Sequence, residues 1–590
     1  MTLRPLVVVG LLAAVLSGTD AAGASAAAAP GPDEPHCSAA TGVVTMSGSV
    51  APTDAKTYRV LPFVVEPGTT RVEVGYSWTP TDGTTLDLGL WDNDGYRSPA
   101  GFRGWSGNRE GRLDKGMQRA WVQADSAERA YIPGTIEPGR WHVELGIAEV
   151  APAGATWHVE VRCTDAATGP EMKADPVDAA HVANPKPGWY RGDFHMHSWN
   201  SNPKAPTYEQ FVQYGRDAGL DFLPMTEYVV NRHWNELGAV QRANPDILLW
   251  PGREVITYFG HVIVLGETPS TVEYRQGFED VTMRDIQRDV LTDGATFGIA
   301  HPTVFPEAQF GSTCRGCEFQ LSDSVDLDRV DTVEVLTDDM VVAGVQNPFV
   351  RTAIDFWQHL LDEGHKVTAV SGSDDKLGPG LGSSCTAVYA TELSRTALRT
   401  AVRSGHAYVQ ALGAKHSPSL EMTATAPDGA TAIMGDTVVA DRSTMTVTVT
   451  NAIGQHLRVL RDGKEAEVVD IDRSPFVHTF EADRAPDEGP LGTYWRVETF
   501  DDVSLTTIAN PIFLADRQPL VRNATAATST TAVTTTTAPA RADATASTGD
   551  SLRGPWTAVV VFVVVVAGLI SGRRWVKRRE VRGTDRPGAS

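Results

Sequence analysis

The chain contains 590 residues and has a formal net charge of -22 at pH 7, because 73 Asp and Glu residues outnumber 51 Lys and Arg residues. Proteins that bind nucleic-acid polymers expose clustered Lys and Arg, so no such polymer is expected as a partner, whereas a small anion in a locally positive pocket stays compatible with this charge. The length allows about three domains besides the terminal segments, at roughly 100 to 200 residues each.

The first residues of the chain, 1–28, predict a secretory signal peptide. Arg4 precedes an apolar run over residues 6–16, and small residues suited to cleavage follow that run. A membrane span is the alternative, but the apolar run is about half as long as the roughly 20 residues that a span needs.

Residues 35–165 predict an all-β sandwich. Apolar residues alternate with polar ones in short runs, such as 71–76 and 141–146, and clusters of Gly, Pro and Asp separate the runs. Cys37 and Cys163 bracket this segment. We therefore expect a disulfide between them, formed in an oxidising compartment.

Residues 187–412 predict an α/β domain, because apolar strand-like runs alternate there with amphipathic helices, a pattern that favours a parallel sheet. A capping-box sequence at 207–210 begins one helix, and Gly364 ends another helix after the sixth strand. The seven expected strands centre on residues 190–195, 221–225, 247–250, 261–265, 296–300, 332–336 and 367–370.

Residues 413–516 return to the alternating β pattern and predict a second all-β sandwich. Its clearest strand lies at 444–449, and Asp462-Gly463 has the sequence of a hairpin turn. No fixed-period repeat relates this segment to the first sandwich.

The C-terminal segments predict a membrane anchor. Residues 521–550 are mostly Thr and Ala and cannot bury enough apolar surface to fold, so they predict a linker. Residues 556–572 are uncharged and rich in valine, which predicts a transmembrane helix, and the basic segment 573–590 predicts a cytoplasmic tail. We expect a single-pass protein of the cell membrane whose folded body is extracytoplasmic.

Metal-competent side chains recur where the apolar runs of residues 187–412 begin or end. In a barrel of parallel strands, the carboxyl ends of the strands converge on one mouth, so residues far apart in the sequence meet there. His261 is the exception, because it opens its run and needs a loop or a short strand to reach the mouth. The residues expected to bind metal are His195, His197, Glu254, His261, His301 and Asp374.

These residue types indicate the chemistry of the site. An HxH pair such as His195 and His197 places both imidazoles on one face of an extended segment, although such a pair alone is more often a chance surface pair. Together with carboxylates, neutral imidazoles suit zinc, manganese or iron. A Glu can bridge two ions, and two ions about 3.5 to 4 Å apart activate a shared water for hydrolysis without a protein nucleophile.

Five motifs in this segment resemble those of the PHP superfamily, named after polymerase and histidinol phosphatase. In chain order they are DFHMHS at 193–198, GLDFLPMT at 219–226, Gly260-His261, Ala300-His301-Pro302 and Ser373-Asp374. The resemblance covers about residues 187–412 and is closest to a secreted branch that includes carbamate hydrolases. It implies a distorted seven-stranded (β/α) barrel, here between two all-β sandwich-like domains and followed by the transmembrane helix.

The resemblance also implies a role for each predicted ligand. His195, His197, Glu254 and Asp374 would hold one divalent ion. Glu254, His261 and His301 would hold a second, so Glu254 would bridge the two.

Three positions differ from the family pattern. Ligands of a third ion are common in the family where Asn202, Tyr228 and Lys376 stand here, so two ions are expected. Glu227 or His233 are the residues that would rebuild a third site. We hypothesise that the Lys376 ammonium takes the place of the third ion and stabilises an anionic group; the alternative is a solvated Lys at the rim.

Other residues near the motifs have less specific patterns. Asp193 is expected to orient a ligand imidazole without binding metal itself. Arg253 suits either an anionic substrate or a neighbouring carboxylate. The lone Cys314-x-x-Cys317 pattern favours a loop disulfide over a zinc site and leaves Cys385 over, but the spacing does not fix the pairing.

The leading functional hypothesis is a metal-dependent phosphoesterase that acts on a small-molecule or cell-envelope substrate. The alternative is hydrolysis of a carboxylic or carbamic ester or amide, since the same activated water attacks a carbonyl carbon. A second alternative, from another class, is a catalytically inactive surface binding protein whose metals only stabilise the fold.

Overall fold

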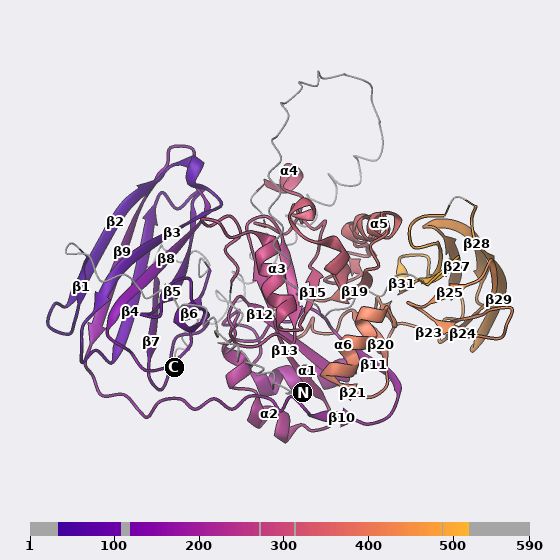
Figure 1. Ribbon diagram of the computed structural model, residues 1–590, viewed down its shortest axis with the longest axis horizontal. Helices are drawn as coiled ribbons and strands as arrows, with labels where there is room; N and C mark the ends of the chain where they lie inside the picture. The colour runs from indigo at the N-terminus through magenta and orange to yellow at the C-terminus, as the bar shows by residue number, and fades with distance from the viewer. Residues whose placement is uncertain (1–33, 108–117, 271–272, 312–313, 487, 519–590) are drawn as a thin grey trace, which may run out of the picture. The chain divides into compact units, whose positions relative to one another are not determined.

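The computed structural model describes residues 34–107, 118–270, 273–311, 314–486 and 488–518 (Figure 1). The predicted signal peptide (1–28), linker (521–550), transmembrane helix (556–572) and cytoplasmic tail (573–590) lie outside these residues. Within the described ranges, no helix is both long enough and apolar enough to cross a membrane.

The first described segment forms two packed β-sheets with the strand orders β1-β3-β8-β5-β6 and β2-β9-β4-β7 (Figure 1). The strands are His36–Cys37 (β1), Val43–Val50 (β2), Thr57–Val65 (β3), Arg71–Thr79 (β4), Thr85–Trp91 (β5), Phe102–Trp105 (β6), Gln118–Gln123 (β7), Gly139–Glu149 (β8) and Ala155–Thr164 (β9). Burial alternates along β9, and its inward Val159 and Val161 share one core with Val143 and Leu145 of the facing sheet. The expected disulfide between Cys37 and Cys163 is confirmed.

All seven strands expected in the central segment are present. They are Gly188–Gly192 (β11), Phe222–Tyr228 (β12), Leu248–Ile256 (β13), His261–Leu265 (β14), Thr296–Ile299 (β15), Thr332–Thr337 (β16) and Thr368–Gly372 (β19). They are hydrogen-bonded in this order, and β14 runs antiparallel to both β13 and β15. The expectation of an all-parallel sheet is therefore wrong: residues 257–260 form too short a connection for a parallel crossover, which needs a dozen or more residues.

The segment after β11 also hydrogen-bonds to the opposite end of this strand series. The Phe194 amide donates to the Ser371 carbonyl at 3.1 Å, and the Asp374 amide donates to the His195 carbonyl at 2.8 Å. Met196 and Asp375 form a parallel bridge. These bonds bring the residues that follow β11 next to those that follow β19.

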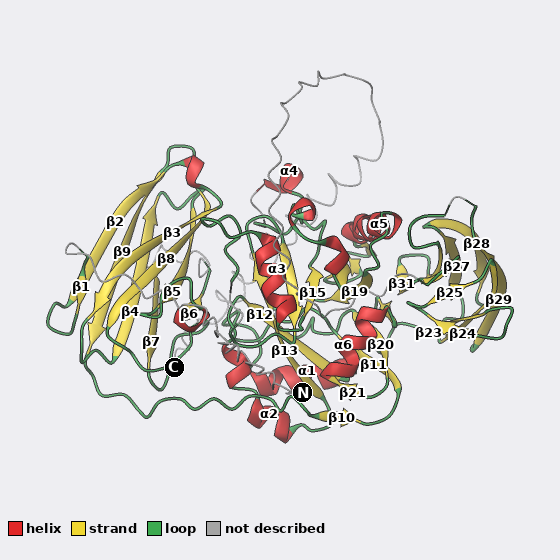
Figure 2. Ribbon diagram, viewed as in Figure 1, coloured by secondary structure: helices red, strands yellow, loops and turns green. Residues whose placement is uncertain are grey.

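Four helices pack on individual strands: α1 on β12, α3 on β15, α5 on β16 and α6 on Cys385–Ala390 (β20), the strand that follows β19 in the chain (Figure 2). The helices are Tyr208–Ala218 (α1), Gly238–Ala243 (α2), Met283–Thr292 (α3), Glu307–Phe310 (α4), Pro348–Asp362 (α5) and Arg395–Ser404 (α6). The expected capping box of α1 is confirmed, because Thr207 and Gln210 each bond the other's backbone amide. Gly364 follows the end of α5 with φ +96°, as a helix-ending glycine does.

The last described segment continues the central sheet. Antiparallel pairing leads from β11 through Cys385–Ala390 (β20) and Ala407–Gln410 (β22) to Leu505–Ala509 (β31). The predicted hairpin at Asp462-Gly463 is confirmed between His456–Arg461 (β27) and Lys464–Asp470 (β28). The other strands are Val182–Asn184 (β10), Val341–Val342 (β17), Val345–Gln346 (β18), Leu393–Ser394 (β21), Ser419–Thr425 (β23), Thr431–Ile433 (β24), Thr437–Val439 (β25), Arg442–Thr450 (β26), Phe476–Asp483 (β29), Thr493–Phe500 (β30) and Ile512–Ala515 (β32).

Candidate metal centre

The six predicted ligands come together in two adjoining groups of side chains. His195, His197, Glu254 and Asp374 each offer a ligand atom, and these atoms all lie within 4.8 Å of one another. His261 and His301 form a second group with Cys317, a residue that was not among the predicted ligands. The four histidines and Glu254 are buried, so the groups lie inside the protein and not on its surface.

The first group is built on the bonded segments after β11 and β19. The Nε2 atoms of His195 and His197 lie 3.2 and 3.0 Å from Oδ1 of Asp374. Gly372 makes this approach possible, since a Cβ there would overlap the Cβ of His195.

Glu254 joins the two groups, because its two carboxylate oxygens face different histidines. Oε2 lies 3.3 Å from Nε2 of His195 and 3.4 Å from Nε2 of His197. Oε1 lies 2.8 Å from Nδ1 of His261 and 3.2 Å from Nε2 of His301. The Glu254 carboxylate thus lies between the two groups and faces both.

The antiparallel direction of β14 explains how His261 reaches the site. Ile256 pairs with His261 in the β13–β14 ladder, so the start of β14 lies beside the carboxyl end of β13, where Glu254 stands. His261 therefore opens its strand and still lies at the same edge as the ligands that end theirs.

Each of the four predicted ligand histidines bonds a protein acceptor through one ring nitrogen, which sets the tautomer of its neutral form. A carboxylate or a carbonyl can only accept, so the ring nitrogen that bonds it carries the proton. The bonds run from His195 Nδ1 to Glu334 Oε1 (3.0 Å), His261 Nε2 to Arg315 O (3.1 Å), His301 Nδ1 to Cys317 O (3.1 Å) and His197 Nδ1 to Ser201 Oγ (3.0 Å). The Ser201 hydroxyl donates to Glu227, which leaves its oxygen to accept from His197. A neutral ring of this tautomer would turn its other nitrogen, with a free lone pair, toward the carboxylates and toward a metal ion held beside them.

The arrangement fits a divalent cation. Nε2 of His195 and Oε2 of Glu254 are buried and have no hydrogen-bond partner in the described structure. Buried polar atoms are almost always paired, and two lone pairs that face each other repel unless a positive charge lies between them. A divalent ion would satisfy both atoms.

The charges within the two groups of side chains favour the ionised form of Glu254. Burial raises the pKa of Glu254, but the charge of His195 and the hydrogen bonds from nearby imidazoles outweigh burial and hold this pKa well below its ordinary value. Burial lowers the pKa of His195, but Glu334, Asp374 and Glu254 outweigh it and raise this pKa well above its ordinary value. The carboxylates therefore draw a proton onto His195, a positive charge that a divalent cation would replace.

Two predicted ligands have left-handed backbone conformations that non-glycine residues rarely adopt. The φ angles are +29° at His301 and +50° at Asp374. Such conformations cost on the order of 1 to 3 kcal/mol each and concentrate at functional sites. In both cases the conformation occurs directly after a strand, where it turns the side chain toward the site.

Lys376 lies next to the first group. Its Nζ forms an ion pair with Oδ1 of Asp374, the oxygen that both His195 and His197 approach. The same Nζ lies 5.6 Å from the centre of the Tyr228 ring, and that ring lies 4.3 Å from the His197 ring. The ammonium is thus at the site, with 27% of its side chain exposed.

Glu227 and His233 are bonded elsewhere. Glu227 accepts from the backbone amides and hydroxyls of Ser198 and Ser201, which engages both of its oxygens. His233 bonds the Gly252 carbonyl at 2.8 Å. Glu227 therefore positions the loop after the HxH pair and, through Ser201, the His197 ring.

Two expectations about neighbouring residues are settled by hydrogen bonds. Asp193 accepts from the amides of His195, Ser373 and Gly382, so it orients backbone; the expectation that it orients an imidazole is wrong. Arg253 pairs with the buried carboxylate of Glu267 and is not available to a substrate.

Glu334 is the residue that sequence reasoning missed. It lies in the middle of the buried strand β16, and its carboxylate bonds His195 Nδ1, the His301 amide and the Thr337 hydroxyl. The sequence does contain an indication of its role, a lone Glu inside the apolar run Thr332–Thr337. A charged side chain in such a run needs a buried partner.

Fold and site together define a mixed α/β protein with a buried histidine and carboxylate cluster suited to divalent metal ions. Similar solved structures include a two-domain protein from Bacteroides vulgatus that contains a predicted PHP-like metal-dependent phosphoesterase, at 15% identity and a TM-score of 0.32, covering 58% of this chain and 99% of that one. The lesion-specific endonuclease PfuEndoQ from Pyrococcus furiosus is 14% identical with a TM-score of 0.25, covering 38% and 58%. An amidohydrolase from Chromobacterium violaceum is 14% identical with a TM-score of 0.21, covering 32% and 89%.

The first of these solved structures is thus described as containing a predicted PHP-like metal-dependent phosphoesterase. The carbamate-hydrolase branch is not confirmed. No protein-family model and no curated protein matches the chain.

Proposed function

We propose that the protein is a metal-dependent hydrolase that acts on phosphoesters. The observation that carries this proposal is the orientation of Glu254, whose two oxygens face two different pairs of histidines. Asp374 completes the first group, and all six predicted ligands serve one centre.

Each side chain has a distinct part in holding the ions. His195, His197 and Asp374 would hold one ion and His261 and His301 the other, with Glu254 shared between them. Two divalent ions supply an activated water and stabilise negative charge on the reacting group. Zinc, manganese and iron all suit this donor set.

The chain's own residues favour an anionic substrate. Lys376 places a positive charge beside Asp374 at the partly exposed side of the first group. Burial lowers the pKa of Lys376, but the Asp374 carboxylate outweighs burial and raises it, so the ammonium stays charged. A phosphate group would gain from this charge more than a neutral carbonyl group would.

We also propose a setting for the reaction. The seven central strands, β11 to β16 and β19, would form a distorted barrel, supported by the bonds that join the residues after β11 to those after β19. The body would be extracytoplasmic and tethered by residues 556–572, supported by the sequence of both ends and by two disulfides. Its substrate would be a small molecule or a component of the cell envelope and not a nucleic-acid polymer.

The test is turnover by the purified full-length protein on matched panels of phosphate monoesters, phosphodiesters, and carboxylic and carbamic esters and amides. Loss of turnover in both His195→Ala and Glu254→Gln, with Glu421→Gln on the exposed face of β23 as the control, would tie activity to the centre. Phosphoester turnover supports the proposal. Turnover of carbonyl substrates alone would establish the alternative hydrolase, and bound metal without any turnover would favour a metal-stabilised binding protein.

A further inference from the structure

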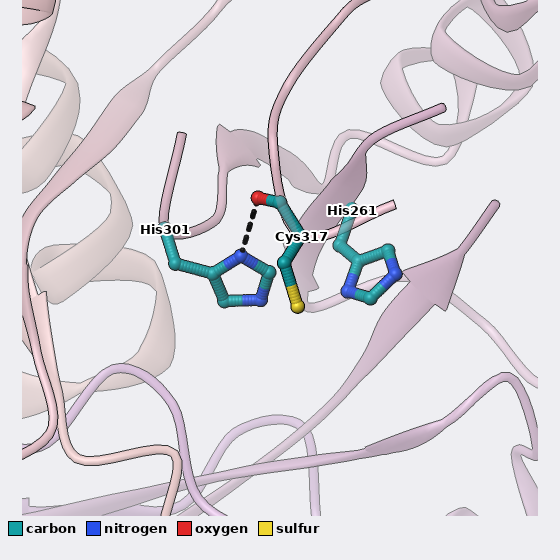
Figure 3. A group of neighbouring side chains, drawn as sticks. All are labelled: His261, His301 and Cys317. Carbon is teal, nitrogen blue, oxygen red and sulfur yellow. Dashed lines mark hydrogen bonds between the residues drawn. The ribbon is translucent and has the colours of Figure 1, made fainter. Parts of the chain in front are cut away.

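The loop that contains Cys314 and Cys317 lies directly on the second group of metal-competent residues. The Arg315 carbonyl accepts from Nε2 of His261 at 3.1 Å. The Cys317 carbonyl accepts from Nδ1 of His301 at 3.1 Å, the bond drawn in Figure 3. One short loop therefore sets the orientation of both imidazoles.

Gly316 holds this loop close to the β13–β14 connection. Its φ is +76°, and a Cβ at this position would overlap the Thr257 carbonyl and lie 3.1 Å from Nε2 of His261. Only glycine allows the loop backbone to approach so closely. The position of the loop relative to His261 is therefore built into the fold.

The sulfur of Cys317 points toward the space between the two imidazoles. Figure 3 shows the side chain between His261 and His301, and ligand atoms of all three residues lie within 4.8 Å of one another. Cys317 is 8% exposed. Its sulfur forms a disulfide with Cys314, as the sequence pattern predicts. A disulfide sulfur is not a thiolate, so in this state Cys317 cannot bind a metal ion as a thiolate ligand.

The second group is short of one ligand. It offers Nδ1 of His261, Nε2 of His301 and Oε1 of Glu254, whereas four ligands surround zinc in most protein sites. Three protein ligands and one open position are typical of catalytic zinc. Four protein ligands that include a thiolate are typical of structural zinc.

We propose that Cys317 is a reversible fourth ligand of the second ion, available only when the Cys314–Cys317 disulfide is open; this rests on the metal centre of the proposed function. A dithiol reductant breaks the sulfur–sulfur bond by supplying two electrons and two protons, and it becomes a disulfide itself. Two cysteine thiols result. The Cys317 thiol then gives its proton to solvent as its sulfur binds the ion.

The disulfide consequently controls the fourth coordination position of the second ion. With the disulfide formed, this position would stay accessible to water. With the disulfide reduced, the Cys317 sulfur would fill the position, hold the ion more tightly and slow hydrolysis. The state of Cys314 and Cys317 thus switches the site between a catalytic and a closed ligand set.

Cobalt substitution tests this proposal, because a thiolate bound to Co²⁺ gives a charge-transfer band in the near ultraviolet. The full-length protein is loaded with Co²⁺, and bound cobalt is counted by mass spectrometry. We expect no band in the oxidised protein and a band after treatment with a dithiol. Cys314→Ser should show the band without any reductant, and Cys317→Ser should never show it.

Cys385→Ala is the matched control, because Cys385 is a buried free thiol, and it should behave as the unmodified protein does. The Cys314→Ser arm needs no reductant, so the Cys37–Cys163 disulfide stays intact. Cobalt bound at two positions in a folded Cys314→Ser protein without the band would overturn the proposal and leave the proposed function standing. Failure of every variant to bind cobalt would overturn both.

Discussion

Nδ1 of His195 lies 3.0 Å from Oε1 of Glu334, and both side chains are buried. The other oxygen of Glu334 accepts from the His301 amide at 3.0 Å. One buried carboxylate therefore fixes the tautomer of a histidine in the first group and the backbone of a histidine in the second. This makes Glu334 a positioning residue for both groups.

Glu334→Gln should weaken metal binding without removing a ligand. A glutamine offers one accepting oxygen where three donors now converge, so either His195 or the His301 amide loses its partner. We expect a loss of roughly 10- to 100-fold in metal affinity, the usual effect of removing such a partner. Competition with a metal-binding dye measures it, with Glu421→Gln as the control. Unchanged affinity would show that the bond does not orient His195.

Lys376→Met should reduce hydrolysis of anionic substrates. Charged hydrogen bonds contribute about 1.5 to 3 kcal/mol, which corresponds to roughly 10- to 100-fold in kcat/KM. Lys376→Arg keeps the charge and should retain much of the activity. Steady-state kinetics on a phosphoester and on a neutral ester separate a loss specific to anionic substrates from a general loss of activity. Equal kinetics of Lys376→Met and the unmodified protein on both substrates would leave Lys376 as a surface charge.

Replacing Cys37 and Cys163 by Ser should destabilise the two packed sheets of the first segment. The disulfide joins residues that are 126 positions apart, and closing a loop of this size stabilises a fold by about 5 kcal/mol in the chain-entropy model. Thermal unfolding of the double variant should begin at a lower temperature. Cys385→Ala controls for the loss of a buried sulfur. Identical melting of all three proteins would contradict this prediction.

His142 should make the same segment less stable in acid. Burial, helped by the charge of Arg140, lowers the pKa of His142 to about 4. Its ordinary pKa is 6.5, so the unfolded chain binds a proton first. The contribution of this histidine to stability is complete above pH 6.5 and is lost as the pH falls from 6.5 toward about 4.

His142→Phe removes this titration and can still pack against the Tyr96 ring, which lies 4.9 Å away. Its thermal stability should fall less steeply over this pH range than that of the unmodified protein. Parallel pH profiles would mean that His142 is protonated equally in the folded and unfolded states.

Local patterns were sufficient to predict the seven central strands and to select six side chains that the structure brings together. Apolar runs indicated the positions of all seven central strands, and the polar residues near the ends of these runs are the six predicted ligands, which lie in two adjoining groups. The hairpin at Asp462-Gly463 and the helix cap at Thr207 were equally local, since turn and cap residues act within a few positions.

Pairing between distant strands could not be predicted in the same way. The period of an apolar run indicates a strand but not its direction, so the reversal of β14, which explains how His261 reaches the other predicted ligands, was not predicted. The pairing of β22 with β31 also joins residues about a hundred positions apart. Glu334 is recognisable as a positioning residue only through its contact with His195, 139 positions away.

The most direct test of the account is the metal content of the full-length protein and three variants, measured by mass spectrometry after loading with Zn²⁺ or Mn²⁺. Asp374→Asn should keep only the ion of the second group, His301→Ala only the ion of the first, and Glu254→Gln neither. A folded protein that binds no divalent ion, or a Glu254→Gln variant that keeps both ions, would contradict the bridging role of Glu254.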